Sequence, residues 1–169
     1  MNSFREIQPR DWSVNPFTKI GAEWMLIAAG RETKANAMTA SWGGVGVLWN
    51  KNVAYIFVRK SRCTKEFIDA ADTFSLTFFD RPQYNEMLAY MGRTSGRSED
   101  KIARAGLTLL HDDTTPYFAE ANTVLLCRKM SRHPITPDGL IDPEVNDRFY
   151  AAGDLHDMYV GEIVKILIK

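Results

Sequence analysis

The sequence predicts a mainly β fold, a barrel with helical insertions. Strand patterns outnumber helix patterns along the 169 residues, and the two do not alternate as they do in a doubly wound sheet. No repeat, low-complexity tract or long linker divides the chain, whose length is typical of one domain. We therefore expect residues 1–169 to form a single domain.

Six segments have the composition or the alternation of a strand. The clearest is Thr73–Phe78, in which apolar and polar residues alternate as in a strand with one buried face. In Asn52–Val58, β-branched and aromatic residues dominate, as in a buried strand. Strands are expected at Trp24–Gly30, Val45–Trp49, Asn52–Val58, Thr73–Phe78, Asn122–Met130 and Met158–Ile168.

Three helices complete the predicted fold. Thr64 is expected to open the first, over Lys65–Asp72, and Pro82 the second, because proline suits the first turn of a helix. Ser98 is expected to cap the third, Lys101–Ala105. The apolar faces of the first two helices hold Phe67, Ile68, Ala71, Met87, Leu88 and Met91.

Charge and hydropathy exclude several classes of partner. Basic and acidic residues number 21 each, so the chain has no basic footprint for nucleic acid and no acidic tail. Met1–Arg10 lacks the apolar core of a signal peptide, and no later apolar run approaches membrane-spanning length. We expect a cytoplasmic protein that binds a small ligand, without nucleic-acid or membrane partners.

No metal site and no catalytic residue are expected. Cys63 and Cys127 form neither a disulfide framework nor a metal quartet. Cys63 follows Arg62 near an expected helix start, which favours a thiolate, but it has no evident resolving cysteine. The glycine cluster Gly43–Gly46 runs into a strand pattern, whereas a dinucleotide-binding loop must open a helix.

The segment from Asn36 to Gly44 is the first candidate binding motif. Its small residues leave backbone N–H groups uncovered, so a flat ring system could approach the chain closely. The hydroxyls of Thr39 and Ser41 are further donors, and Trp42 offers an aromatic surface. The same pattern also fits a half-buried strand that enters a glycine turn, and both interpretations stay open at this point.

The second motif, Arg59–Thr64, follows a buried strand pattern. Arg59, Lys60 and Arg62 supply positive charge next to an expected helix start, where free N–H groups attract anions. The alternative is an ordinary N-cap at Thr64 beside solvated cations.

Two further features have both structural and functional interpretations. The polar loop Gly92–Lys101 enters a helix, and Glu99 and Asp100 near that helix start are explained by its dipole. His156 near a strand is more often a structural residue than a catalyst.

The chain resembles the flavin reductase-like FMN-binding split-barrel family, and in particular its flavoredoxin-type branch. The likeness covers nearly the whole chain, and four strings in one order are specific. They are Asn36-x-Met38-Thr39-Ala40-Ser41-Trp42-Gly43-Gly44-x-Gly46 with Leu48-Trp49, Val58-Arg59-x-x-Arg62-x-Thr64, Ser95-Gly96-Arg97-x-x-x-Lys101, and His156-x-x-Tyr159-x-Gly161-Glu162-Ile163.

The resemblance implies a split β-barrel that binds FMN. Its first motif would lie along the isoalloxazine ring and its second at the ribityl phosphate, with the third nearby. Cys63 stands where an aromatic residue is common in the family. The implied cofactor-binding residues are Asn36, Met38, Thr39, Ala40, Ser41, Trp42, Arg59, Ser61, Arg62, Cys63, Thr64, Ser95, Gly96, Arg97 and Lys101.

The resemblance also implies a function, with alternatives. The first is an NAD(P)H-dependent flavin reductase, in which reduced nicotinamide passes hydride to N5 of the flavin. The second is a flavoredoxin-like electron carrier that exchanges electrons with a protein partner without nicotinamide turnover. The third is a flavin-free barrel used for interaction. The family usually forms homodimers with FMN near the subunit interface, so a symmetric dimer is expected.

Overall fold

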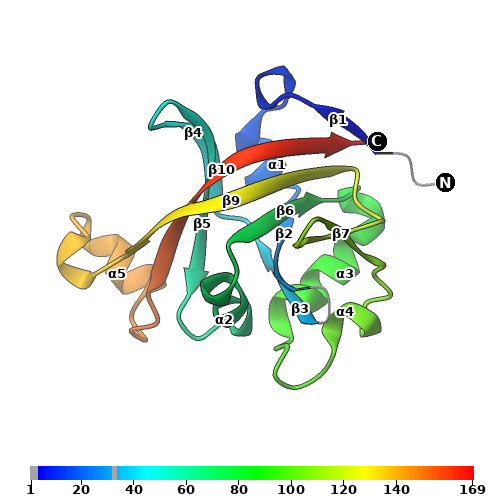
Figure 1. The fold of residues 1–169 in the computed structure, drawn as a ribbon. Helices are drawn as coiled ribbons and strands as arrows, with labels where there is room; N and C mark the ends of the chain where they lie inside the picture. Colours follow the sequence, from blue (N-terminus) through cyan, green and yellow to red (C-terminus); the bar gives the residue numbers. More distant parts are fainter. Residues whose placement is uncertain (1–3, 32–33) are drawn as a thin grey trace.

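The computed structural model describes residues 4–31 and 34–169 (Figure 1). Strands and helices follow one another along the chain in this order: β1 (Arg5–Ile7), α1 (Pro16–Gly21), β2 (Met25–Arg31), β3 (Lys34–Ala40), β4 (Gly43–Leu48), β5 (Lys51–Arg59), α2 (Cys63–Ala70), β6 (Thr73–Phe78), α3 (Arg81–Arg93), α4 (Lys101–Arg104), β7 (Leu109–Asp112), β8 (Thr115–Phe118), β9 (Thr123–Pro134), α5 (Pro143–Phe149) and β10 (His156–Ile168). Short 3-10 turns occupy Pro9–Asp11 and Pro137–Gly139.

One antiparallel sheet organises the described residues. Its strand order is β3-β2-β6-β9-β10-β5-β4, with β1 added to the end of β10, while β7 and β8 form a separate hairpin. Strands β3 and β4 terminate this path, so each has a sheet neighbour on one side only among the described residues. Ser41 and Trp42 join these two edges. The expected mainly β fold with helical insertions is confirmed.

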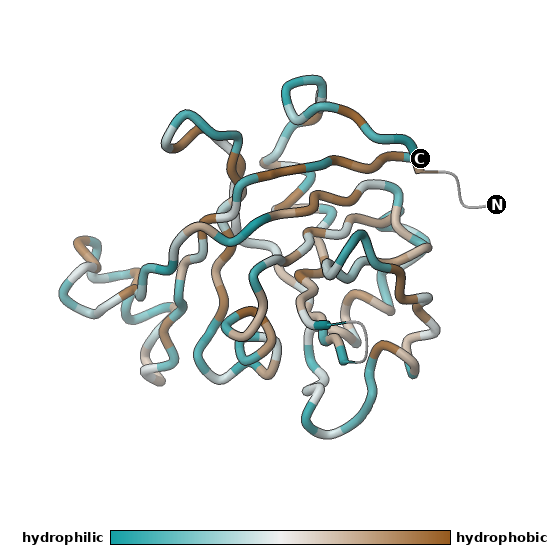
Figure 2. Tube along the Cα trace, viewed as in Figure 1, coloured by the Kyte–Doolittle hydropathy of each residue, from teal (hydrophilic) through white to brown (hydrophobic). Residues whose placement is uncertain are grey.

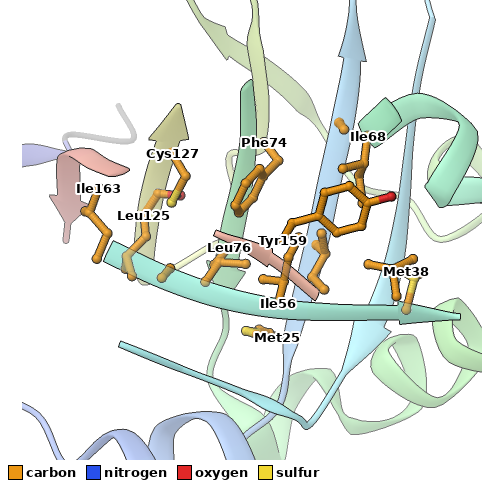
Figure 3. Packing of buried hydrophobic residues seen from close by; sticks show 14 of the residues in the cluster. Met25, Met38, Ile56, Ile68, Phe74, Leu76, Leu125, Cys127, Tyr159 and Ile163 are labelled. Atoms are coloured by element: carbon orange, nitrogen blue, oxygen red, sulfur yellow. The ribbon is translucent and has the colours of Figure 1, made fainter. Parts of the chain in front are cut away.

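Apolar side chains fill both faces of the sheet. One cluster lies inside its curve and includes Phe74, Ile56 and Tyr159, which are fully buried (Figure 3). A second cluster lies between the sheet and a layer made by α3, α4 and the β7–β8 hairpin, and includes Leu88 and Phe118. Figure 2 shows the same division along the chain, with hydrophobic residues along the central strands and hydrophilic ones at many of the outer loops.

A partly buried polar network closes one end of the inner cluster. Nζ of Lys65 lies 2.6 Å from Oδ2 of Asp69, 3.0 Å from Oδ2 of Asp157 and 2.9 Å from the hydroxyl of Tyr159. Burial opposes the charge of Lys65, but these hydrogen bonds outweigh it and raise its pKa. The network fastens α2 to β10 and so fixes the position of the segment that begins at residue 59.

The six expected strands are present, with ends that shift by a few residues. The first helix differs at its start, because α2 begins at Cys63 and its N-cap is Arg62, which makes no side-chain capping bond. The expectation that Thr64 opens the helix is therefore wrong, since its hydroxyl accepts a hydrogen bond from Asn36 instead. Ser98 does not cap α4 either. Asp100 does, and its carboxylate accepts from the backbone N–H of Ala103 at 3.1 Å.

Several elements had no clear sequence signal. The strands β1, β7 and β8 are three or four residues long, and α1 and α5 have six and seven residues. Within the described ranges, no helix is both long enough and apolar enough to cross a membrane. Residues 1–3 of the predicted single domain, and 32–33, lie outside the described residues.

Replacing Gly161 with alanine is expected to destabilise the fold by about 1–3 kcal/mol, because the added methyl group overpacks the core. A Cβ at Gly161 would lie 2.5 Å from Cζ of Phe74 and 3.0 Å from Cβ of Cys127. Urea unfolding followed by circular dichroism measures the change. Gly21→Ala is the control, since a Cβ there meets no atom within 4 Å. Equal stability of the two variants would contradict the prediction.

Candidate functional site

An open cavity of about 420 Å³ lies along the free edge of β3. Because β3 pairs with β2 alone among the described residues, every second residue of β3 points its N–H and C=O away from the sheet. The volume falls within the range of small-molecule sites, roughly 300–1,000 Å³. This cavity, which we call the ring cavity, is lined by Met38, Thr39, Ala40, Ser41, Trp42, Phe57, Arg59, Ser61, Arg62 and His156.

A smaller cavity of about 150 Å³ shares three residues with the ring cavity, Met38, Ser61 and Arg62. Three cations and four hydroxyl side chains line it, without a carboxylate among its described lining residues. It also includes the first turn of α2, where backbone N–H groups have no intrahelical partner. We call this the anion cavity; its lining is Met38, Ser61, Arg62, Cys63, Thr64, Arg93, Thr94, Ser95, Gly96 and Lys101.

Two of the cations in the anion cavity are desolvated. Burial lowers the pKa of Arg62, and the neighbouring charge of Arg59 lowers it further, against a smaller opposing effect of Asp154. Burial, together with Arg62, lowers the pKa of Lys101 to about 8. The ammonium of Lys101 donates to the carbonyls of Met91 at 3.0 Å and Thr94 at 2.9 Å, so one of its three N–H bonds is left over.

One buried hydrogen bond joins the walls of the anion cavity. Nδ2 of Asn36 on β3 donates to Oγ1 of Thr64 on α2 at 3.0 Å. The loop after α3 packs against the same amide, since a Cβ built at Gly96 would lie 2.8 Å from Cγ of Asn36. A glycine is therefore needed for this close approach.

The segment between α5 and β10 holds the end of β5. Arg59 donates to the carbonyls of Asp154 at 2.5 Å and Phe149 at 3.2 Å. The carboxylate of Asp154 accepts from both the backbone N–H and the hydroxyl of Ser61, at 3.1 and 2.5 Å. In this way the loop holds two residues that line the ring cavity, Arg59 and Ser61.

Aromatic rings surround His156 at the mouth of the ring cavity. Its ring lies 5.3 Å from that of Trp42, which in turn meets Phe149 edge-on at 5.2 Å. Nδ1 of His156 lies 2.9 Å from the hydroxyl of Tyr150. Burial, followed by the charge of Arg59, lowers the pKa of His156 to about 4, so the imidazole is neutral at pH 7.

The structure brings most of the predicted residues to the two cavities. Asn36 braces the walls from behind. Arg97 lines neither cavity. Its guanidinium donates hydrogen bonds to the carbonyl of Ser61 and to the carboxylate of Glu66. A third cavity of about 450 Å³ adjoins Gly96 and Lys101, but the carboxylates of Glu99 and Asp100 make it unsuitable for an anion.

Sequence reasoning missed four lining or bracing residues. Phe57 shares a strand face with Arg59 through the two-residue period of β5, a signal that was present. Arg93 and Thr94 directly precede the Ser95-Gly96 motif and belong with it. Tyr150 had no sequence signal, because only the path of the loop before β10 brings it to His156.

Comparisons with known proteins agree with this geometry. The model of the family described as flavin reductase like domain matches residues 17–169. A flavin reductase-like FMN-binding domain from Shewanella baltica superposes with a TM-score of 0.68 at 15% identity, over 99% of this chain and 78% of that one. Flavoredoxin from Methanosarcina acetivorans does so with a TM-score of 0.67 at 22% identity, over 98% and 76%.

A third neighbour carries an enzyme name. The NADH:FAD oxidoreductase SgcE6 from Streptomyces globisporus has a TM-score of 0.65 at 16% identity, over 87% of this chain and 75% of that one. No protein of the curated collection matches the chain. At these identities the structural neighbours establish the fold, the predicted split barrel, while the family match covers most of the sequence. The chain therefore belongs to the flavin reductase-like domain family, and the flavin predicted from its sequence is the cofactor that this family binds.

Proposed function

We propose that the protein is an FMN-dependent oxidoreductase of the flavin reductase type. The observation that carries the proposal is the pair of joined cavities. One is wide and runs along a free strand edge, and the other is small and lined by cations and hydroxyls without a carboxylate among the described residues. Such a pair suits a flat ring system that ends in a phosphate group. The names of the neighbours, FMN-binding protein and flavoredoxin, support FMN as the flavin.

Each wall has a part in holding the cofactor. The residues from Met38 to Trp42 lie along the ring system, with backbone groups of β3 as hydrogen-bond partners. Arg62 and Lys101 neutralise the phosphate, and the hydroxyls of Thr64 and Ser95 donate to its oxygens. Arg59 and Arg97 hold the surrounding loops through the bonds described above, and their contact with the cofactor stays a prediction. The same holds for Cys63, which lines the anion cavity.

The redox chemistry is supplied by the bound flavin, whose N5 accepts a hydride from reduced nicotinamide. The residues that line the ring cavity would position the ring, and because this cavity is open, a nicotinamide could reach the bound flavin. The name of SgcE6, an NADH:FAD oxidoreductase, supports a nicotinamide donor. The alternative, an electron carrier without nicotinamide turnover, is supported by the names of the flavoredoxins.

A homodimer remains part of the proposal. Phe17 on α1 and Val47 on β4 are 86% and 71% exposed, and Trp49 beyond β4 is 54% exposed. An exposed apolar surface of this kind is typical of an interface between subunits. The single domain and the cytoplasmic location stay predictions from the sequence.

Purified protein is expected to bind one FMN per chain, and Arg62→Gln is expected to weaken that binding roughly 10- to 100-fold, as for the loss of a charged hydrogen bond. Fluorescence titration measures the affinity. Riboflavin, which lacks the phosphate, should lose much less affinity than FMN, because Arg62 also lines the ring cavity but has no phosphate to neutralise there. Arg128→Gln, at an exposed arginine paired with Glu162, is the matched control. Absence of stoichiometric flavin would refute the proposed function, and an equal loss for riboflavin would refute the phosphate assignment.

FMN affinity is expected to fall as the pH rises above 8. Below the pKa of Lys101, about 8, the ammonium is charged before FMN arrives, and above it the free protein must take up a proton on binding. The affinity then falls by up to about tenfold per pH unit. Titrations between pH 7 and pH 9 measure the slope. Lys101→Met should bind more weakly with a flatter profile. An unchanged slope in Lys101→Met would contradict the assignment.

Mixing the FMN-loaded protein with NADH or NADPH in a stopped-flow instrument is expected to bleach the flavin absorbance. Catalytic turnover should follow when free flavin is added as acceptor. Reduction by dithionite but by neither nicotinamide would favour the electron carrier instead. Both functions predict the same bound cofactor, so a binding measurement cannot separate them. Reduction by nicotinamide separates them, because only the reductase predicts it.

A further inference from the structure

We propose that Tyr150 is a positioning residue, which donates its hydroxyl proton to Nδ1 of His156 and so turns Nε2–H of that histidine into a fixed hydrogen-bond donor facing the ring cavity. The ligand group it serves is an acceptor atom, a carbonyl oxygen or ring nitrogen, on the edge of the flavin ring. This inference rests on the proposed function for the identity of the ligand, but the Tyr150–His156 pair is a property of the protein alone.

The geometry defines which nitrogen is engaged. Nδ1 of His156 lies 2.9 Å from the Tyr150 hydroxyl, and both side chains are more than nine-tenths buried. Nε2 has no hydrogen-bond partner within the described residues, yet it is not among their buried unpaired polar atoms. Since His156 lines the ring cavity, Nε2 is the edge of the imidazole that opens to it.

The direction of the hydrogen bond follows from counting donors. A neutral imidazole has one N–H, and a tyrosine has one O–H. If Nδ1–H donated to Tyr150, the O–H of this 7%-exposed residue would need another acceptor, and the described residues offer none. A buried unsatisfied donor costs about 1–3 kcal/mol. If the hydroxyl donates instead, both protons are used, because Nε2–H projects into the cavity.

The surroundings keep the imidazole neutral and oriented. Burial, followed by the charge of Arg59, disfavours the imidazolium; Asp154 opposes them, and Arg62 has a smaller effect in the same direction as Arg59. Burial also raises the pKa of the Tyr150 phenol, so this residue keeps its proton at pH 7. The guanidinium of Arg59 lies over the Tyr150 ring, 5.4 Å from its centre, and Trp42 stacks obliquely on the imidazole. The ring therefore has little freedom to turn.

The position of the donor fits a flat ligand along β3. His156 pairs with Arg59 across β10 and β5, on the wall that faces Met38–Trp42. A ring held by the backbone of β3 on one side would present another edge to Nε2–H. A neutral donor suits a carbonyl oxygen or ring nitrogen, because it adds no charge to a cavity already bordered by Arg59 and Arg62.

Long-range ¹H–¹⁵N imidazole spectra of the flavin-free protein test the pair directly. The chain has 3 histidines, so His156 is assigned by comparison with His156→Asn. We expect the ¹⁵N chemical shift of Nδ1 of His156 to be that of an unprotonated nitrogen, and that of Nε2 to be that of a protonated nitrogen. Tyr150→Phe should move both resonances toward the average of two exchanging tautomers. A protonated Nδ1 in the original protein, or spectra unchanged in Tyr150→Phe, would overturn the proposal.

Flavin titration tests what the donor serves. We expect FMN and riboflavin to shift Nε2–H of His156, and Tyr150→Phe to weaken both flavins equally, roughly two- to tenfold, because the contact is with the ring. Tyr84→Phe is the control, at a tyrosine that packs on Phe79 away from both cavities. Flavin binding without a shift of Nε2–H would overturn the ligand contact alone. Failure to bind any flavin would refute both the proposed function and this contact. The tautomer measurement would still test the Tyr150–His156 hydrogen bond, because it uses the flavin-free protein.

Discussion

The site depends on one buried joint, at which the amide of Asn36 meets the hydroxyl of Thr64 and the backbone of Gly96. Three segments that are distant in sequence, the edge strand β3, the start of α2 and the loop after α3, meet there. Each contributes one wall of the anion cavity. A hydrogen bond shielded from water is costly to break, because its partners would stay buried and unsatisfied. The joint therefore holds the three walls of the anion cavity together.

Electrostatics around this joint are unbalanced in a chain whose net charge is zero. Arg62, Arg93 and Lys101 line one small cavity without a carboxylate among the described residues around them. The fold compensates part of this charge with dipoles, since Lys101 donates to carbonyls at the C-terminal end of α3, where the helix dipole is negative. Arg62 and Arg93 form no ion pair within the described residues, and Asp154 offsets only part of the positive charge at Arg62. An anion that enters would remove the repulsion, and by mass action it would stabilise the folded state as well.

Local patterns predicted most of the sheet, because two-residue alternation and strand composition are short-range signals. They left the binding motifs open, and it was the resemblance of four motifs to a known family that implied most of the residues that line the cavities. Local patterns failed where tertiary contacts compete with local ones. Thr64 looked like a cap, but its hydroxyl is engaged by Asn36, 28 residues away. Asp100 rather than Ser98 caps α4, because the carboxylate of Asp100 accepts a hydrogen bond from the backbone N–H of Ala103. Tyr150 could not be found at all, since its partner lies across a loop whose path no pattern in the sequence encodes.

The two ends of the site differ in what holds them, and this difference bears on function. The anion cavity is framed by residues of β3, by the start of α2 and by the end of α3 with the loop that follows it. The loop from Phe149 to Asp154 does not line the ring cavity, but it holds two residues that do, because Arg59 donates to the carbonyls of Phe149 and Asp154 and Ser61 donates to the carboxylate of Asp154. Loops carry function because they can vary without disturbing the scaffold. A change in this loop would therefore move Arg59 and Ser61 at the ring cavity without touching the joint at Asn36.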